Sequence, residues 1–149
     1  MELKIEGVES LMRKLNYLGG NVTAAIDKGL GTGANKIKAD AKRFCPYDTG
    51  RLKGSISSER ISPMEWAVGT NVLYAPCVEF GTGRKGSPKV YHTFRESWSY
   101  KDEKGQWHTS HGQPPRPFLY PAMLYNKDYV FKACRLALAK AVREAMNNG

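Results

Sequence analysis

The chain has 149 residues, of which 41% are apolar, so it is long enough to bury a core as one domain, which we expect to span residues 1–149. Its 23 Lys and Arg exceed its 14 Asp and Glu, and the net charge of +9 favours polyanionic partners such as nucleic acid. No apolar run reaches the roughly 18 residues of a membrane span, and no signal-peptide core follows Met1, so we expect neither a membrane protein nor a secreted one.

The cysteine content fits a reducing environment. Cys45, Cys77 and Cys134 are an odd number and include no closely spaced pair, which is unlike a disulfide framework. We therefore predict free thiols, with Cys134 buried in an apolar helical stripe.

The N-terminal third is predicted to be mainly helical. After a short strand at residues 3–5, apolar residues recur at helical spacing from Val8 to Leu18 and, beyond a Gly-Gly break, from Asn21 to Phe44. Three glycines lie in the stripe of the second helix, Gly29, Gly31 and Gly33. Each costs a helix about 1 kcal/mol relative to alanine, so their clustering predicts either a kink or a very close neighbour.

The middle of the chain is predicted to form antiparallel strands. Short β-branched or aromatic segments at 52–61, 66–69 and 73–80 are separated by turn residues. Two further strands, 89–99 and 106–111, flank a turn and predict a hairpin that is polar and aromatic on both faces. Such a hairpin has little core of its own, so we expect it to lean on another surface.

A proline-rich connector, residues 113–117, leads into a last amphipathic helix that is predicted to run from beyond Pro121 to about Met146. This order of elements indicates an α+β fold. We expect an antiparallel sheet of about four strands packed against a long N-terminal helix and a C-terminal helix, with a projecting β-hairpin.

Two short motifs resemble catalytic or nucleotide-binding signatures but lack their context. Asp48-Thr49-Gly50 is the triplet of retroviral-type aspartic proteases, yet it follows a predicted helix instead of an apolar strand, so we interpret it as a turn. Residues 81–86 match GxGxxG, but Ser87-Pro88 follows where a dinucleotide fold needs a helix. A basic, glycine-rich loop of this kind can still meet phosphate.

The histidines do not define a metal or catalytic site. His92, His108 and His111 have no carboxylate or thiol placed to complete a zinc site, which favours exposed hairpin histidines. A small basic ribonuclease could use His92, Arg95 and His111 as acid, base and phosphate clamp, but nothing in the sequence fixes their geometry. We assign no catalytic residue, no metal and no cofactor.

Three further segments, taken together and in their order along the chain, resemble the pattern of a known family. Residues 45–56 read CPYDTGRLKGSI, residues 68–82 read VGTNVLYAPCVEFGT, and residues 115–122 read PRPFLYPA. Together they resemble the tail-completion and tail-component proteins of siphophages, a family of lambdoid head–tail joining and minor tail proteins. The positions that carry the structural motif are Pro46, Thr49, Gly50, Leu52, Ile56, Tyr74, Gly81, Pro117, Phe118 and Pro121.

The resemblance implies a non-enzymatic virion protein of a phage or prophage, located in the tail or neck and assembled in the host cytoplasm. It implies a ring, sixfold like the tail tube, at the head-proximal end of the tail. There the protein would complete the tail, bind the tail tube and the head–tail connector or stopper protein, and let genomic DNA pass without sequence specificity. No membrane contact is expected. The segment 88–113 departs from the family pattern, and we interpret it as a hairpin arm or insertion.

Residue roles follow from the resemblance as hypotheses. Thr49-Gly50 would form the turn before the first strand, whereas Tyr74-Ala75 and residues 79–81 would form a central strand and its exit. Glu79 would need a basic partner or a donor if buried, and Arg51 is the predicted partner. Phe118 would anchor the last helix.

The contacts that we expect fall into two groups. Inter-subunit or partner contacts are predicted for Arg51, Glu79, Tyr91, Phe94, Trp98 and Trp107. DNA-facing positions are predicted for Arg84, Lys85 and Lys89. The alternative function is a small basic nucleic-acid-binding protein or toxin-like nuclease.

Overall fold

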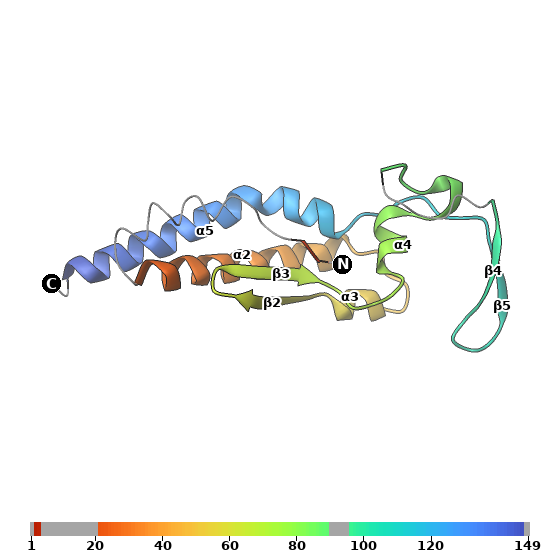
Figure 1. Ribbon diagram of the computed structural model, residues 1–149, viewed down its shortest axis with the longest axis horizontal. Helices are drawn as coiled ribbons and strands as arrows, with labels where there is room; N and C mark the ends of the chain where they lie inside the picture. Colours follow the sequence, from red (N-terminus) through yellow and green to blue (C-terminus); the bar gives the residue numbers. More distant parts are fainter. Residues whose placement is uncertain (1, 4–20, 90–95, 148–149) are drawn as a thin grey trace.

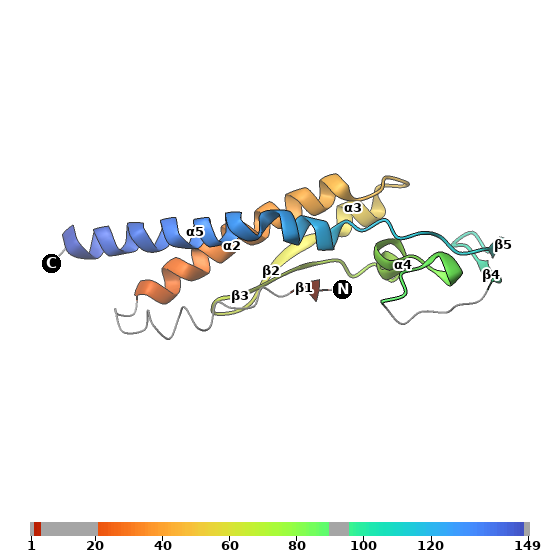
Figure 2. The same cartoon turned by 90° about the horizontal axis from the view of Figure 1, so that it is seen from above.

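The computed structural model describes residues 2–3, 21–89 and 96–147. Two long helices, α2 (Asn21–Phe44) and α5 (Leu119–Asn147), lie side by side along the molecule (Figure 1). Strands β1 (Glu2–Leu3), β2 (Ser57–Ser62) and β3 (Glu65–Gly69) form an antiparallel sheet in the order β1-β3-β2 beside these helices (Figure 2).

The remaining elements form the end of the molecule opposite the C-terminus (Figure 1). They are the short helices α3 (Arg51–Ser55) and α4 (Ala75–Phe80), the 3₁₀ turn η2 (Gly83–Lys85), and the strands β4 (Trp98–Lys101) and β5 (Trp107–Ser110). β4 and β5 pair only with each other among the described strands, as a separate two-stranded hairpin. No helix in the described ranges is long and apolar enough to cross a membrane.

Glycine lets α2 and α5 approach closely. A Cβ atom on Gly29 would lie 2.6 Å from the Cα atom of Cys134, and one on Gly33 would lie 2.6 Å from a methyl carbon of Val130. The third glycine, Gly31, faces the indole of Trp66 in the sheet. Of the two explanations for the glycine cluster, a very close neighbour is therefore confirmed, on two sides of the same helix.

The core lies between the two long helices, the sheet and the start of α5. α2 contributes a buried stripe at helical spacing, and β3 contributes Val68, which alternates with the more exposed Ala67 and Gly69. The largest fully buried side chains are those of Phe118, Ile26, Ile56, Leu119 and Val130. All three cysteines are free and Cys134 is buried, as the sequence predicts, and Cys45 is buried as well.

Asp27 of α2 holds the turn between β2 and β3. Its carboxylate accepts hydrogen bonds from Arg60 Nε at 2.7 Å, from the Met64 amide at 3.0 Å and from Trp66 Nε1 at 3.0 Å. Met64 has a φ of 62°, the left-handed region that a non-glycine residue adopts only at a cost. The three bonds to Asp27 therefore fix both the turn and the sheet against α2.

A buried polar pair joins α2 to α5. The Asp40 carboxylate accepts a hydrogen bond from Asn126 Nδ2 at 2.7 Å, and Asn126 also donates to the Ala122 carbonyl at 2.8 Å. Lys36 and Arg43, one turn away on α2, form ion pairs with Asp40 at 3.2 and 3.3 Å. The hydrogen bond from Asn126, assisted by these cations and opposed by burial, holds the pKa of Asp40 below its ordinary value of 3.8.

The α+β class and both long helices agree with the sequence prediction, but the sheet does not. Three strands form the sheet, whereas about four were expected, and the hairpin forms a second, separate sheet. Residues 51–55 are helical because Leu52 and Ile56, four residues apart, both face the core. The predicted strand 73–80 is wrong because Pro76 opens helix α4. The predicted helix Val8–Leu18 lies outside the described residues.

The first prediction concerns the glycine contact between the long helices. We expect Gly29→Ala to lower the free energy of unfolding by about 1–3 kcal/mol, because the new methyl group collides with the backbone of α5. Gly54→Ala is the matched control, since a Cβ there meets nothing within 4 Å. Urea denaturation measures both, and a Gly29→Ala protein as stable as the Gly54→Ala protein would contradict the close packing.

A second prediction concerns pH. A carboxyl whose pKa is lowered in the folded state stabilises the protein above its ordinary pKa, and this contribution is lost as the pH falls below about 3.8. Asp40→Asn should cost about 1 kcal/mol at pH 7, the difference between charged and neutral hydrogen bonds. Denaturation midpoints measured from pH 7 down to acid should converge for the two proteins, and a constant gap would argue against an ionised Asp40.

Candidate assembly site

Three segments meet near the end of the molecule opposite the C-terminus: α4, the connector into α5, and the base of the β4–β5 hairpin. α4 starts in the sequence Tyr74-Ala75-Pro76, and proline in the first turn of a helix loses no hydrogen bond. Ala75, Val78 and Glu79 then fall on one helical face, where Ala75 and Glu79 are buried. This local helix turns an acidic side chain toward the start of α5.

Glu79 caps α5 from a different element. It is only 3% exposed, and its Oε2 atom accepts hydrogen bonds from the amides of Phe118 at 2.8 Å and Leu119 at 3.1 Å. Its Oε1 atom accepts from the Tyr120 amide at 2.9 Å. The first amides of a helix have no partner within the helix and carry partial positive charge. Glu79 therefore satisfies donors that would otherwise be buried unpaired.

The connector is paired along α4 and the loop that follows it. Thr82 and Gln113 exchange backbone hydrogen bonds of 2.9 and 3.2 Å, and the Gln113 side chain donates to the Cys77 carbonyl at 2.9 Å. Gly81 has a φ of 75°, and a Cβ there would lie 2.6 Å from the Gln113 carbonyl oxygen. Glycine is required at this crossing by both conformation and space, and the base of the hairpin is thereby fixed.

We call β4, β5 and the turn between them (residues 98–110) the hairpin arm. Asp102 organises the turn, because its Oδ1 atom accepts from the amides of Lys104 and Gln106, each at 2.9 Å. Its Oδ2 atom lies 2.8 Å from His108 Nε2, and this hydrogen bond holds the pKa of Asp102 below its ordinary value. Asp at the first position of a tight turn is a signal that the sequence carries.

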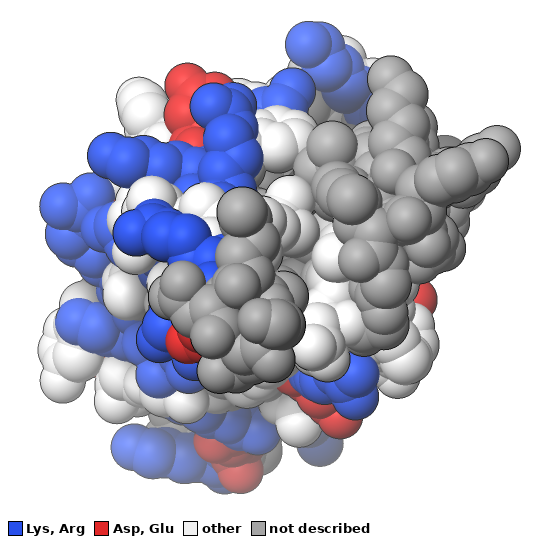
Figure 3. Space-filling model, turned by 90° about the vertical axis from the view of Figure 1, so that its left-hand side faces the viewer, with Lys and Arg blue, Asp and Glu red and all other residues white. Residues whose placement is uncertain are grey.

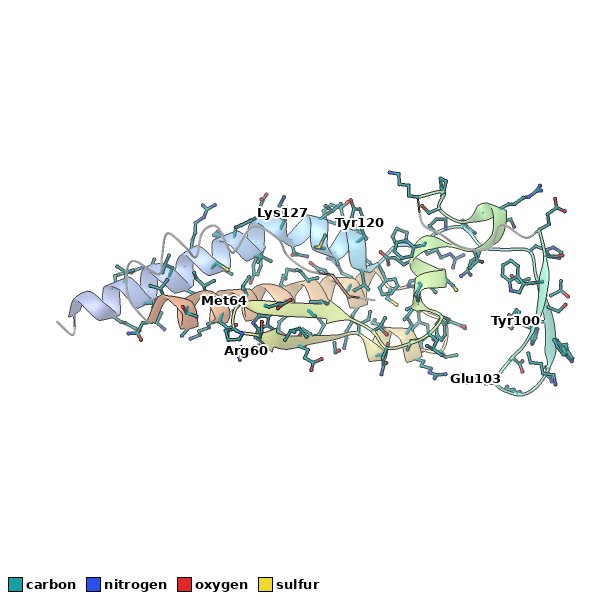
Figure 4. All side chains as sticks on the ribbon, viewed as in Figure 1. Arg60, Met64, Tyr100, Glu103, Tyr120 and Lys127 are labelled. Atoms are coloured by element: carbon teal, nitrogen blue, oxygen red, sulfur yellow. The ribbon has the colours of Figure 1, made fainter. Side chains whose placement is uncertain are left out.

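The arm presents aromatic side chains to solvent. Trp107 is 68% exposed, with the Lys101 ammonium 5.1 Å from the centre of its ring, and Tyr100 stacks on His108. Figure 4 shows Tyr100 and Glu103 on the arm, well apart from Arg60 and Lys127 on the body. The arm is therefore an ordered hairpin with uncovered apolar surface.

Two ion pairs connect the arm region to the body. Glu103, in the turn of the arm, pairs with Arg51 at the start of α3, and Glu96 pairs with Arg84 of η2 at 2.8 Å. All four side chains are more than half exposed. Such surface pairs contribute about 0–1 kcal/mol each, so they set the position of the arm more than they stabilise the fold.

The structure separates several of the residues that the sequence grouped as contacts. Arg51 does not pair with Glu79 within the chain, because Glu79 is buried against the start of α5 and Arg51 binds Glu103 on the surface. Trp98 is half-buried and Trp107 exposed, both on the arm. Tyr91 and Phe94 lie outside the described residues. Arg84, Lys85 and Lys89 are exposed together in the loop after α4.

The structural motif residues have distinct local environments. Thr49 Oγ1 accepts a weak hydrogen bond from the Arg51 amide at 3.4 Å, and Gly50 has a φ of 80°, so the Asp48-Thr49-Gly50 segment is a turn, as predicted. The predicted central strand through Tyr74 and Glu79 is instead α4. Leu52, Ile56 and Phe118 are buried, Pro46 and Pro121 are half-buried, and Tyr74 and Pro117 are exposed.

The helix pair carries a charge feature that the sequence analysis did not single out. α2 and α5 together contain ten Lys and Arg but four Asp and Glu. Figure 3 looks onto the end where α2 begins and α5 ends, and Lys and Arg side chains crowd one side of this view. The sequence does contain a signal of this basic surface, because Lys132 and Lys140 are eight residues apart and therefore lie on one face of α5. Within the described residues, no cluster of His, Cys, Asp or Glu could hold a metal ion.

A third prediction tests the Glu79 cap. Glu79→Ala should lower the free energy of unfolding by about 3 kcal/mol or more, since it leaves three amides without their carboxylate acceptor. Glu79→Gln keeps one acceptor oxygen and should lose less. Chemical denaturation provides the values, with Glu59→Ala on the exposed face of β2 as the control. Equal stability of the Glu79→Ala and Glu59→Ala proteins would refute the cap.

Comparison with known proteins identifies the family. Residues 9–81 match the family model described as "Bacteriophage HK97-gp10, putative tail-component", and this match ends at Gly81, before the hairpin arm. No curated protein and no solved structure matches the chain significantly. The matched part contains α2, the turn at Asp48-Thr49-Gly50 and the helix that carries Glu79. The match over residues 9–81, just under half of the chain, supports placing it among the HK97-gp10-like bacteriophage tail components, and with them a structural role in the virion.

Proposed function

We propose that the protein forms a ring at the head-proximal end of a phage or prophage tail, completes the tail and joins it to the capsid connector. Membership of a tail-component family supports a structural role in the virion. The proposed ring is a hexamer, and its further partners are the tail tube protein and the connector or stopper protein. A closed ring requires two different surfaces on each copy, one for each neighbour.

The observation that carries this proposal is the hairpin arm. It stands apart from the three-stranded sheet, and its Trp107 and Tyr100 side chains are 68% and 48% exposed. An isolated hairpin is marginal in water, and aromatic residues are enriched in protein interfaces. In the proposed ring the arm, which lies within the segment 88–113, packs on the neighbouring copy, with Trp98, Trp107, Tyr91 and Phe94 as contacts.

Genomic DNA passes through the proposed ring without sequence recognition. The loop with Arg84, Lys85 and Lys89 is the candidate for phosphate contact, since its cations are exposed and phosphate contacts carry no sequence information. Repeating a charge of +9 around a ring costs electrostatic energy, which DNA or acidic partner rings offset. Arg51 pairs with Glu103 of the arm, so it joins the inter-subunit contact only through the arm.

A fourth prediction tests the function in the phage or prophage that encodes the chain. Deleting the gene should yield separate heads and tails, or tails of abnormal length, in electron micrographs. The wild-type gene should restore joined particles, whereas a gene in which residues 98–110 are replaced by a short Gly-Ser linker should not. The arm lies outside the core, so the purified arm-deleted protein should still unfold cooperatively.

The outcomes separate the function from the role of the arm. Normal tails firmly attached to heads without the protein would contradict tail completion. Joined particles with the arm-deleted protein would contradict only the arm contact. Turnover of RNA or DNA by the purified protein, abolished by one side-chain change, would instead favour the nuclease alternative.

A further inference from the structure

A groove runs between residues 21–32 of α2 and residues 129–144 of α5, away from the hairpin arm. It has a volume of about 1080 Å³. Its floor is made of small side chains and glycine from both helices, Ala24, Ala25, Gly29, Ala133, Ala137 and Ala141. Small residues let another backbone approach closely. The groove is therefore shaped to receive a third element alongside the two helices.

The rim of the groove is basic and partly apolar. Lys28 of α2 and Lys132 and Lys140 of α5 line it, with Glu144 as its acidic member. Leu136 lies between the two α5 lysines at intervals of four residues, so all three fall on one helical stripe about 12 Å long. Leu136 is 59% exposed, and Tyr129, which also lines the groove, is 43% exposed.

We propose that this groove binds an amphipathic helix of another protein, one whose apolar stripe is flanked by Asp or Glu. The apolar residues of that helix cover Leu136 and the alanine floor, which is the usual arrangement of a helix bound in a groove. Its carboxylates at four-residue spacing meet Lys28, Lys132 and Lys140. The inference concerns a surface different from the arm and does not depend on the ring.

Two other occupants fit less well. A DNA duplex would use the lysines, but phosphates gain nothing from covering Leu136 and the alanine floor. A second copy of the helix pair would bring like charges together, because α2 and α5 carry ten basic and four acidic residues. Like-charge contact across an interface is unfavourable. The acidic amphipathic helix satisfies both the charge and the apolar surface.

The test uses the purified full-length chain and a fluorescent helical peptide of about 20 residues, with Leu and Ala on one face and Glu on its flanks. Fluorescence anisotropy should detect binding that weakens with added salt. The double variant Lys132→Glu/Lys140→Glu should weaken binding about tenfold, and Leu136→Gln about fivefold. The double variant Arg135→Glu/Arg143→Glu, on α5 but outside the groove, removes as much positive charge and is the charge-matched control, which should leave the affinity unchanged.

Each further outcome decides against the proposal. No binding of the peptide, or equal binding of a scrambled peptide of the same composition, overturns it. Equal weakening of peptide binding by Arg135→Glu/Arg143→Glu would show that only the overall charge of the protein matters. If a short DNA duplex binds more tightly than the peptide, and Leu136→Gln does not change its affinity, the groove is a phosphate-binding surface. The binding assay does not require a ring. A negative result in it therefore does not bear on the proposed tail function, and a negative result in the gene-deletion experiment does not bear on the groove.

Discussion

The close approach of α2 to α5 is the constraint on which the rest of the structure depends. At Gly29 and Gly33 the second helix occupies the space where a side chain would be, so the helices pack nearly backbone to backbone. This contact orients the face of α2 that binds the sheet through Asp27 and Trp66. It also brings Asp40 within hydrogen-bond distance of Asn126, which satisfies two buried polar groups at once.

Glu79 links the packed helix pair to the elements at the opposite end of the molecule. Its carboxylate accepts hydrogen bonds from three backbone amides at the start of α5, which joins α4 to the long helix. α4 in turn holds the connector at the base of the hairpin arm, because the Cys77 carbonyl accepts a hydrogen bond from Gln113. The arm thus has a fixed base but exposed aromatic surface and weak surface ion pairs. A hairpin with a fixed base and exposed aromatic side chains is suited to contact a neighbouring protein.

The molecule therefore offers different chemistry at its two ends. The arm end is aromatic and mixed in charge, whereas the groove end is basic around a floor of small residues. A tail component assembles with other virion proteins, and two chemically different surfaces let one chain discriminate between two kinds of neighbour. The groove is built on the two long helices, whereas the arm is a hairpin whose base is held by hydrogen bonds to α4 and the loop after it.

The sequence by itself determined the two long helices, the turn at Asp48-Thr49-Gly50, the free cysteines and the α+β class, because periodicity and turn chemistry are local. It also carried the family motifs. Only the tertiary structure decided that Glu79 caps α5 instead of pairing with Arg51, and that two helices line a basic groove. These features join residues some 40 or more positions apart, and short apolar runs fit helix or strand equally well until such partners are in place.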